Sequence, residues 1–467
     1  MDKMTQNSHN SVFVRTVDAE TLPPPQNETG IRGWLWRNLL YSVTDYSSVS
    51  ASLRSLAMIF FTVLVSYVGL TQIWLLLDFV FFSAVWSDPT GIKREACWTV
   101  SQGGTLPDDW HAACWPFIFV KLKFLAYGPY PMDELWRVNV TGLLGLAGLC
   151  WVLIEALPYR RLVGVLMLTA YPVIALILLT GGASEANYFN AAAYIFVGLA
   201  LITVGRLGQR GLLGVVASDF ASIIGFVGWS LIVFQVLMLI FSVDVGLKPV
   251  GTGDWGGLMI TLVVAVTGIV VSLPLGVILA LGRRSNMPVA RLLCTIFIEF
   301  WRGVPLISVL FMASVMIPLF LPEGVNFDKL MRALIGVMLF SAAYMAEVVR
   351  GGLQAIDKGQ YEAAEAMGLT YWQSMRQIIL PQALTHVIPG IVNTFIGLFK
   401  DTTLVSIIGL FDLLGAGKSA IADASWSSPV QAISIYLFVG FIFFIFCFGM
   451  SRYSIFMEKK LSKSRSH

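Results

Sequence analysis

The sequence contains few charged residues, few histidines and few cysteines, and each shortage argues against a class of protein. Only 13% of its 467 residues are charged, about half the share of an average soluble domain. This shortage of charge argues against a soluble protein. The four histidines are scattered without the spacing of a zinc or haem site, so no metal site is expected. A net charge of +3 is too small to indicate a nucleic-acid partner.

Apolar residues dominate the composition. They account for 57% of the chain, and the mean hydropathy is +0.76. A run of about 20 apolar residues is long enough to cross a bilayer. The pattern predicts an all-α polytopic membrane protein with about ten transmembrane helices. The candidate spans are 56–83, 139–157, 163–181, 190–205, 222–242, 258–281, 293–320, 331–349, 385–410 and 432–452.

The basic residues predict the orientation, because Lys and Arg in short loops mark the cytoplasmic side. If ten spans are counted, they fall on one side: Arg160, Arg161, Arg206, Arg210, Arg283, Arg284, Lys358, Arg376, Lys459, Lys460, Lys463 and Arg465. Both termini are therefore expected in the cytoplasm. Residues 1–54 form a polar tail without a cleavable signal peptide, and 458–467 form a basic tail.

The chain is expected to divide near residue 255. Residues 55–255 form an N-terminal membrane extension of about five helices with a large extracytoplasmic loop at 86–138. Cys97 and Cys114 lie in this loop, where they form a disulfide if the compartment is oxidising and remain separate thiols if it is not. No clear internal repeat supports an inverted-repeat transporter.

One long connection, residues 356–382, has the pattern of a helix, a turn and a second helix. Asp357 is placed to cap the first helix, and Gly368 can end it in a left-handed conformation. Thr370 opens the second helix with a Gln three residues later, and Pro381 breaks or bends it. The local pattern alone favours an amphipathic hairpin lying on the membrane surface.

The same residues carry a family signature. Glu362-Ala363-Ala364, Gly368, Ile378 and Leu380-Pro381 have the spacing of the EAA motif of ABC-importer permeases. The stretches "FIEFWRGVPLI", "AEVVRGGLQAI" and "FKDTTLVSIIGLFDL" extend the likeness from Gly256 to near Met457. Residues 256–457 thus resemble the five-helix, type I permease core of the polar amino-acid family. The likeness is greatest to the M-type membrane subunit of general L-amino-acid importers.

This resemblance implies a transport subunit of the bacterial inner membrane and not an enzyme. The implied partners are an extracytoplasmic amino-acid-binding protein, a second homologous permease subunit and a cytosolic ABC ATPase dimer. The ATPase would use ATP and Mg, and this chain would bind no cofactor. The residues implied to couple to the ATPase are Glu362, Ala363, Ala364, Gly368, Leu380 and Pro381.

Polar residues within spans are costly and mark a candidate substrate pathway. Two clusters qualify: Glu299, Arg302, Gly303 and Pro305 in one span, and Asn393, Lys400, Asp401, Thr402 and Thr403 in another. Asp401 can contact the ammonium group of an amino acid, and Arg302 or freed backbone NH groups can contact its carboxylate. Alternatively, Glu299 pairs with Arg302 and Lys400 with Asp401. Glu347 and Arg350 are expected to form a structural pair.

Three other functions compete with the importer. An ion-coupled secondary amino-acid transporter would leave the EAA motif unexplained. A membrane enzyme would need a catalytic cluster, and the sequence contains neither a metal-ligand set nor a nucleophile with its base. A receptor or scaffold has no signature here.

The stretch "LLGAGKSA" (413–420) resembles the end of a phosphate-binding loop. Such a loop needs a glycine five residues before Gly417, where this chain has Asp412, and it needs a preceding strand. The stretch is expected to be an outer turn between the last two spans, on the side without ATP.

Overall fold

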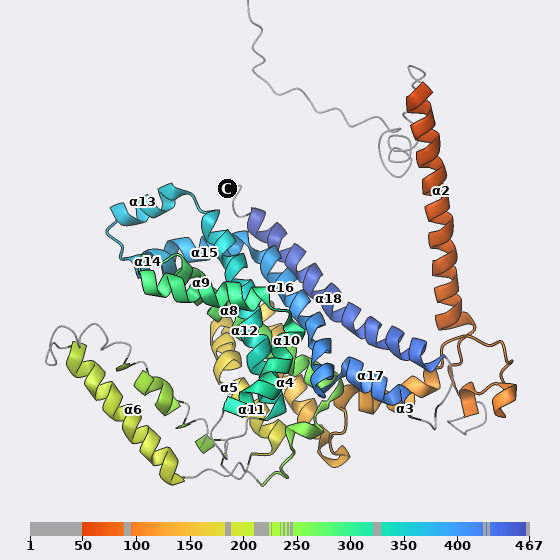
Figure 1. The fold of residues 1–467 in the computed structure, drawn as a ribbon, viewed down its shortest axis with the longest axis horizontal. Coiled ribbons are helices and arrows are strands. Elements are labelled where there is room, and N and C mark those ends of the chain that lie inside the picture. Colours follow the sequence, from red (N-terminus) through yellow and green to blue (C-terminus); the bar gives the residue numbers. More distant parts are fainter. Residues whose placement is uncertain are drawn as a thin grey trace, which may run out of the picture. The chain divides into compact units, whose positions relative to one another are not determined.

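The computed structural model describes residues 49–87, 95–182, 188–209, 246–320, 328–423 and 430–463, with Trp426 and scattered positions between 224 and 242. These residues are mostly helical (Figure 1). The chain forms two compact units, residues 1–84 and 85–467.

The described part of the first unit is one long helix. Helix α2 (Val49–Leu77) continues into a π-helical turn, η3 (Asp78–Phe82). No residue in the most apolar stretch of Ala57–Phe82 is buried. A helix that is apolar on all sides and exposed is typical of a membrane span in contact with lipid.

The second unit begins with short turns and four helices. They are η4 (Glu95–Cys97), η5 (Val100–Gln102), α3 (Trp115–Tyr127), η6 (Met132–Glu134), α4 (Leu135–Leu153), α5 (Arg160–Thr180) and α6 (Tyr188–Gln209). Helix α3 lies within the segment 86–138, which the sequence predicts as a loop. It buries Phe117, Ile118 and Leu125 and packs against α8, α17 and α18 of the C-terminal part. Residues 85–467 therefore form one unit, and the boundary expected near residue 255 does not divide it.

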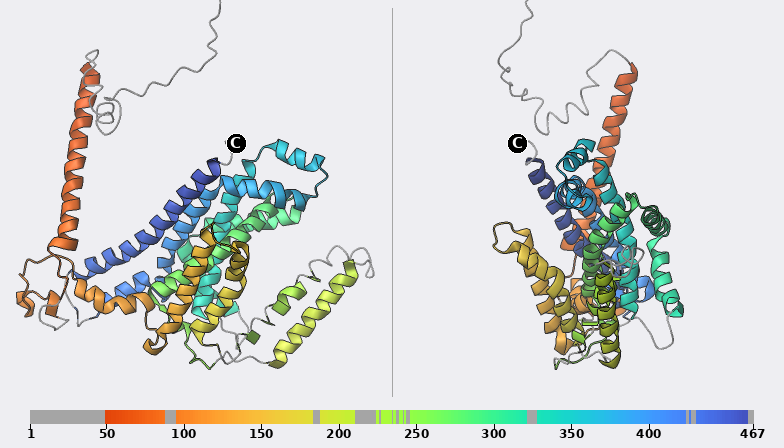
Figure 2. Two further views of the ribbon diagram at one scale, coloured as in Figure 1. Left: turned by 180° about the vertical axis from the view of Figure 1, so that it is seen from behind. Right: turned by 90° about the vertical axis from the view of Figure 1, so that its left-hand side faces the viewer.

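The C-terminal part of the second unit consists of helices, helical turns and a short strand. Its elements are η7 (Thr252–Asp254), α8 (Gly257–Arg283), α9 (Pro288–Gly303), α10 (Leu306–Phe311), η8 (Met312–Met316), α11 (Ile317–Phe320), α12 (Lys329–Gln354), α13 (Lys358–Ala366), α14 (Tyr371–Ser374), η9 (Met375–Ile379), α15 (Leu380–His386), α16 (Ile388–Asp401), η10 (Thr402–Ile408), β1 (Phe411–Asp412), α17 (Leu413–Ile421) and α18 (Gln431–Lys463). The segment α13–α15 lies at one end of this unit, and α3 and α17 lie at the other (Figures 1 and 2).

The described residues contain seven helices long and apolar enough to span a membrane, or eight if one bent pair counts as a span. This agrees with an all-α polytopic membrane protein. Of the ten expected spans, 190–205 corresponds to a shorter apolar stretch, Ala192–Gly208. The span expected at 222–242 is described only at scattered positions, which are mostly helical.

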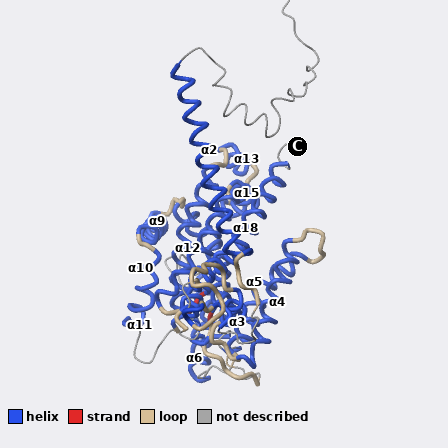
Figure 3. Tube along the Cα trace, turned by 90° about the vertical axis from the view of Figure 1, so that its right-hand side faces the viewer, coloured by secondary structure: helices blue, strands red, loops and turns tan. Residues whose placement is uncertain are grey.

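The span expected at 293–320 is not one straight helix. Helices α9 and α10 meet at an angle of 104°, and Figure 3 shows α9 crossing the direction of α10. Val304 and Pro305 adopt extended backbone angles between them, because proline disfavours a helical conformation in the residue before it. The sequence pattern contains this break at Gly303–Pro305, but the angle depends on packing.

Helices α8 and α12 form the centre of the C-terminal part and pack along each other. Gly276 allows their close approach, because a Cβ atom there would lie 2.7 Å from the Cβ of Met345. Ala342, Ala343, Met345 and Ala346 of α12 are fully buried. This small-residue packing is typical of helix contacts in membranes.

Candidate functional site

The EAA motif lies on a compact hairpin formed by α13, α14, η9 and α15, residues 358–386, which we call the EAA hairpin. Helix α13 ends in a Schellman motif: the NH of Gly368 donates to the carbonyl of Glu365 at 2.9 Å, and the NH of Leu369 to that of Ala364 at 3.2 Å. Gly368 has the left-handed φ of +72° that the sequence predicts. The chain reverses there because glycine adopts this conformation without strain.

Capping residues define the helix starts. Thr370 and Gln373 form the expected capping box at the start of α14. Asp357 occupies the N-cap position of α13, but its side chain makes no capping hydrogen bond. The sequence predicts a break or a bend at Pro381, and the structure shows no break. The π-helical turn η9 precedes it and α15 continues through it, since a proline in the first turn of a helix needs no NH donor.

The two motif alanines face opposite ways. Ala364 is fully buried, whereas Ala363 and the neighbouring Glu362 are exposed. Met367 and Trp372 beside them are 67% and 68% exposed, although both are large and apolar. Exposed apolar side chains around small residues are a feature of protein contact sites. Met367 and Trp372 are candidate contact residues that the motif alone does not indicate.

The other side of the hairpin is anchored to the helices that span the membrane. Ile379 and Ala383 are fully buried and join one apolar cluster with Val349 and Leu353 of α12 and Ala280 of α8. Leu380 packs partly buried against this cluster, while Pro381 is exposed. Because protein interiors are close-packed, a displacement of the hairpin is passed to α12 and α8.

A network of ion pairs connects α8, α9 and α12 close to this hairpin. Glu347 accepts hydrogen bonds from Arg283 at 2.6 Å and from Arg350 at 2.8 Å, and Arg302 lies 3.7 Å away. Arg283 also pairs with Glu299 at 2.8 Å. We call these five residues the Glu347 network. It contains the expected pair Glu347–Arg350, but Glu299 pairs with Arg283 and not with Arg302.

Arg283 is a further candidate functional residue. In the sequence it serves only to predict which side of the membrane is cytoplasmic. It ends α8, and packing against α9 and α12 brings it to both glutamates. Three arginines and two glutamates share the network, so each carboxylate has a partner. Such a network fixes the geometry of the groups it joins more than it adds stability.

The second polar cluster lies on α16 and η10. The hydroxyl groups of Thr402 and Thr403 donate to the carbonyls of Phe399 and Lys400, within their own segment. Asn393 and Lys400 are exposed, and Asp401 is half-buried. No ion pair between Lys400 and Asp401 occurs among the described residues.

The two polar clusters are not assembled into one site. Helix α9 packs mainly against α8 and α12, whereas α16 packs mainly against α18, α12 and α8. Glu299 and Arg302 take part in the Glu347 network, and Gly303 and Pro305 lie at the bend between α9 and α10. Among the described residues, no hydrogen bond or ion pair joins the α16 cluster to the α9 cluster.

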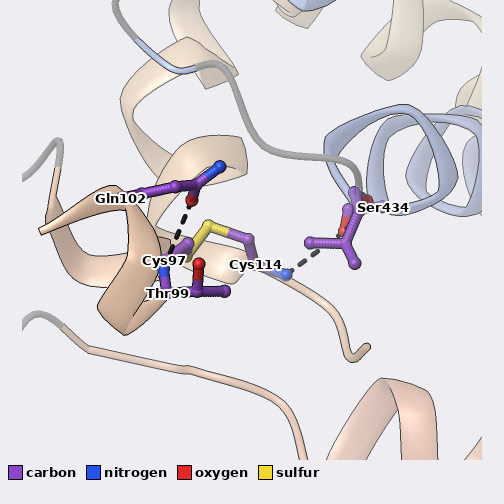
Figure 4. The surroundings of a disulfide bond; sticks show 6 residues. Cys97, Thr99, Gln102, Cys114 and Ser434 are labelled. Atoms are coloured by element: carbon purple, nitrogen blue, oxygen red, sulfur yellow. Dashed lines mark hydrogen bonds between the residues drawn. A yellow bond between two sulfur atoms is a disulfide. The ribbon is translucent and has the colours of Figure 1, made fainter. Parts of the chain in front are cut away.

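The opposite end of the unit contains a disulfide. Cys97 and Cys114 are joined, and the NH of Cys114 donates to the hydroxyl of Ser434 on α18 at 3.2 Å (Figure 4). Farther along α3, Lys121 pairs with Asp423 at 2.5 Å, and the ring of Phe117 lies 5.4 Å from that of Trp426. The disulfide segment and α3 are therefore attached to the ends of α17 and α18.

The stretch "LLGAGKSA" is a helix and not the expected turn. It forms most of α17, and the carboxylate of Asp412 caps it by accepting hydrogen bonds from the NH groups of Leu414 and Gly415. Burial raises the pKa of Asp412 to about 6, although these bonds act to lower it. With a carboxylate at its N-terminus, this helix presents no phosphate-binding loop.

These features define an α-helical membrane protein with a compact helical hairpin, the EAA hairpin, at one end. The model of the family "binding-protein-dependent transport system inner membrane component" matches residues 272–461. The Glutamate/glutamine/aspartate/asparagine transport system permease protein BztC of Rhodobacter capsulatus is 39% identical over 97% of this chain and 98% of its own length. The Inner membrane amino-acid ABC transporter permease protein YhdY of Escherichia coli is 42% identical over 84% of this chain and 86% of its own length. The chain belongs to this family of amino-acid ABC transporter permeases.

A shorter relative shows how the similarity divides. The Probable amino-acid permease protein YxeN of Bacillus subtilis is 35% identical over 90% of its own length but only 44% of this chain. The rest of the chain is shared with the Rhodobacter capsulatus relative, which matches nearly end to end. Family membership makes the chain a multi-pass, inner-membrane transport subunit and not an enzyme, and it implies a partner ATPase and a binding protein.

Proposed function

We propose that this chain is a permease subunit through which amino acids, delivered by an extracytoplasmic binding protein, enter the cell at the expense of ATP hydrolysed by a cytosolic ATPase dimer. The EAA hairpin is the observation that carries this proposal. It combines an exposed face of Glu362, Ala363 and Met367 with a buried face packed on the spanning helices. That arrangement suits the transfer of motion from a partner to the membrane.

The contact is assigned to the exposed face. Ala363 permits close approach and Glu362 offers a charge-assisted hydrogen bond, while Met367 and Trp372 supply apolar area. Ala364 and Gly368 are assigned structural roles: Ala364 sets the packing of the hairpin, and Gly368 sets its reversal. Leu380 and Pro381 start the helix that returns to the membrane.

The EAA hairpin must lie in the cytoplasm if it meets an ATPase. Both termini are then cytoplasmic by the charge distribution, and the disulfide between Cys97 and Cys114 lies outside, where disulfides persist. A second, homologous permease subunit completes the membrane part, as in a heterodimer. ATP and Mg act on the ATPase, and this chain binds no cofactor.

The α16 cluster is the better candidate for the substrate pathway. Arg302 and Glu299 are held in the Glu347 network, whereas Asp401 and Lys400 have no ion pair with each other among the described residues. Asp401 is placed to meet the ammonium group of a substrate and Lys400 its carboxylate. The bend at Gly303–Pro305 would then allow α9 and α10 to move relative to each other, and would not bind the substrate directly.

Uptake by membrane vesicles tests the proposed function. Vesicles containing the complete importer are loaded with ATP, and a panel of labelled amino acids is added outside with the binding protein. We expect uptake that requires internal ATP and persists when ionophores collapse the ion gradients. Uptake that follows the ion gradients and ignores ATP would favour the ion-coupled secondary transporter.

A further inference from the structure

A cavity between the end of α8 and the EAA hairpin has no role in the coupling described above. Its volume is about 440 Å³, within the range of small-molecule pockets. It is lined by Leu281, Arg284, Asn286, Leu353, Tyr361, Glu365, Leu369, Tyr371, Ser374 and Met375. The lining therefore combines an apolar part with hydrogen-bonding groups and two charges of opposite sign.

The two charged residues come from different elements. Arg284 follows the last residue of α8, and Glu365 lies near the end of α13. No ion pair joins them within the described part of the chain. A cation and a carboxylate that line one cavity without bridging it can each bind a group of a zwitterionic ligand.

Aromatic residues fix the position of Arg284. Its guanidinium lies 5.7 Å from the centre of the Tyr361 ring and donates to the Tyr361 hydroxyl at 3.3 Å. That hydroxyl donates in turn to the carbonyl of Leu353 at 3.2 Å. Burial raises the pKa of Tyr371, and the positive charge of Arg284 opposes this rise. The cation is held by a built set of contacts.

The apolar part of the lining limits the ligand further. Leu353 and Met375 are buried, and Leu281 and Leu369 are half-buried. Leu281 and Leu369 therefore offer an apolar surface for an uncharged, branched or linear side chain. A nucleotide would bring phosphate charges for which the cavity has no further partner, since Arg284 and Glu365 are the only charged lining residues in the described part of the chain.

We propose that this cavity binds a free L-α-amino acid from the cytosol, with the carboxylate on Arg284, the ammonium on Glu365 and the side chain against Leu281 and Leu369. The cytosolic source rests on the proposed function, which places the hairpin in the cytoplasm and releases amino acid there. The bound ligand ties α13 to the end of α8. It therefore restrains the hairpin and slows the transport cycle when the product accumulates.

Binding is tested first, on the purified importer complex in nanodiscs, by equilibrium dialysis of labelled L-leucine. Two analogues each lack one charge: 4-methylpentanoate has no ammonium, and 3-methylbutylamine has no carboxylate. We expect Arg284→Gln and Glu365→Gln to weaken leucine binding at least about tenfold, the loss for one charge-assisted hydrogen bond. Neither analogue should compete with leucine. The matched controls Arg291→Gln on α9 and Glu458→Gln on α18, both exposed, should bind as the wild type does.

Two results would overturn the site. One is leucine binding unchanged in both cavity variants. The other is binding that falls in Asp401→Asn and not in Arg284→Gln, which would place the ligand in the transport pathway. This measurement needs no transport, so it stands even if ATP-driven uptake fails.

Regulation is tested second, in proteoliposomes that hold ATP and L-leucine inside. Internal leucine should slow uptake severalfold in the wild type and in Arg291→Gln, and should have no effect in Arg284→Gln or Glu365→Gln. Equal inhibition of all four proteins would overturn the regulatory role. Loss of the ATPase from the Arg284→Gln complex would show that the cavity instead receives a side chain of the ATPase.

Discussion

Replacement of Gly368 should uncouple the importer without removing it from the membrane. A Cβ atom at Gly368 would meet no atom within 4 Å, so the cost of adding one lies in the backbone, whose φ is +72°. For a residue with a Cβ atom this conformation costs about 1–2 kcal/mol, and each 1.4 kcal/mol is a tenfold change in an equilibrium. Gly368→Val should therefore lower the population of the closed turn about tenfold.

Substitutions at Gly368 that differ in how well they tolerate a positive φ separate this backbone strain from other causes. Gly368→Asn should retain most activity, because Asn tolerates the left-handed region. Gly368→Asp adds a negative charge at the C-terminal end of α13, where it is unfavourable, and should be uncoupled. Gly359→Ala is the matched control, since Gly359 also has open space but lies inside α13.

The assay is ATP-driven amino-acid uptake by vesicles, normalised to the amount of the chain in the membrane. We expect near-normal uptake for Gly359→Ala and a loss of about tenfold for Gly368→Val at equal abundance. Normal uptake by both Gly368→Val and Gly368→Asp would refute the assignment of the turn to coupling.

Three further predictions concern stability, each measured as the thermal midpoint of the purified protein. Glu347→Gln leaves three arginines with one carboxylate, so it should lower the stability by a few kcal/mol and impair uptake. Glu299 lies at the more exposed end of the network, so Glu299→Gln should cost less than about 1 kcal/mol. Equal effects of the two substitutions would contradict the network. Cys97→Ser should cost about 3 kcal/mol by opening the loop to Cys114, and a reductant should destabilise the wild type but not the variant; an unchanged midpoint would count against the disulfide. Because the folded protein raises the pKa of Asp412 from 3.8 to about 6, the contribution of Asp412 to stability is greatest below pH 3.8 and falls by up to about 3 kcal/mol as the pH rises through 6. Asp412→Asn should remove this slope, and an identical pH profile for both proteins would argue against it.

Local signals predict much of the EAA hairpin. Gly368, Thr370 and Gln373 each act through neighbours two to four residues away, and the structure places all three in the expected conformations. Of the two outcomes expected at Pro381, a break and a bend, the break does not occur, because the π-helical turn η9 precedes the proline and Pro381 lies in the first turn of α15. Propensity rules do not include such a bulge.

Contacts distant in sequence explain the other differences. Arg283 reaches Glu347, 64 residues away, only because α8 and α12 pack together. The 104° bend between α9 and α10 is marked by Gly303 and Pro305, but its angle is set by neighbouring helices. Helix α17 formed where a turn was expected, since Asp412 caps it from a buried position.

The most direct test of coupling through the EAA hairpin is co-purification of the ATPase from membranes with Ala363→Trp and with the wild type. Ala363 is exposed beside the buried Ala364, so a Trp there should leave the fold intact and obstruct the partner. We expect the wild-type chain to retain the ATPase and Ala363→Trp to lose it, with uptake lost in parallel. A wild-type chain that purifies without any ATPase, or an Ala363→Trp complex that keeps its ATPase and its uptake, would contradict the account.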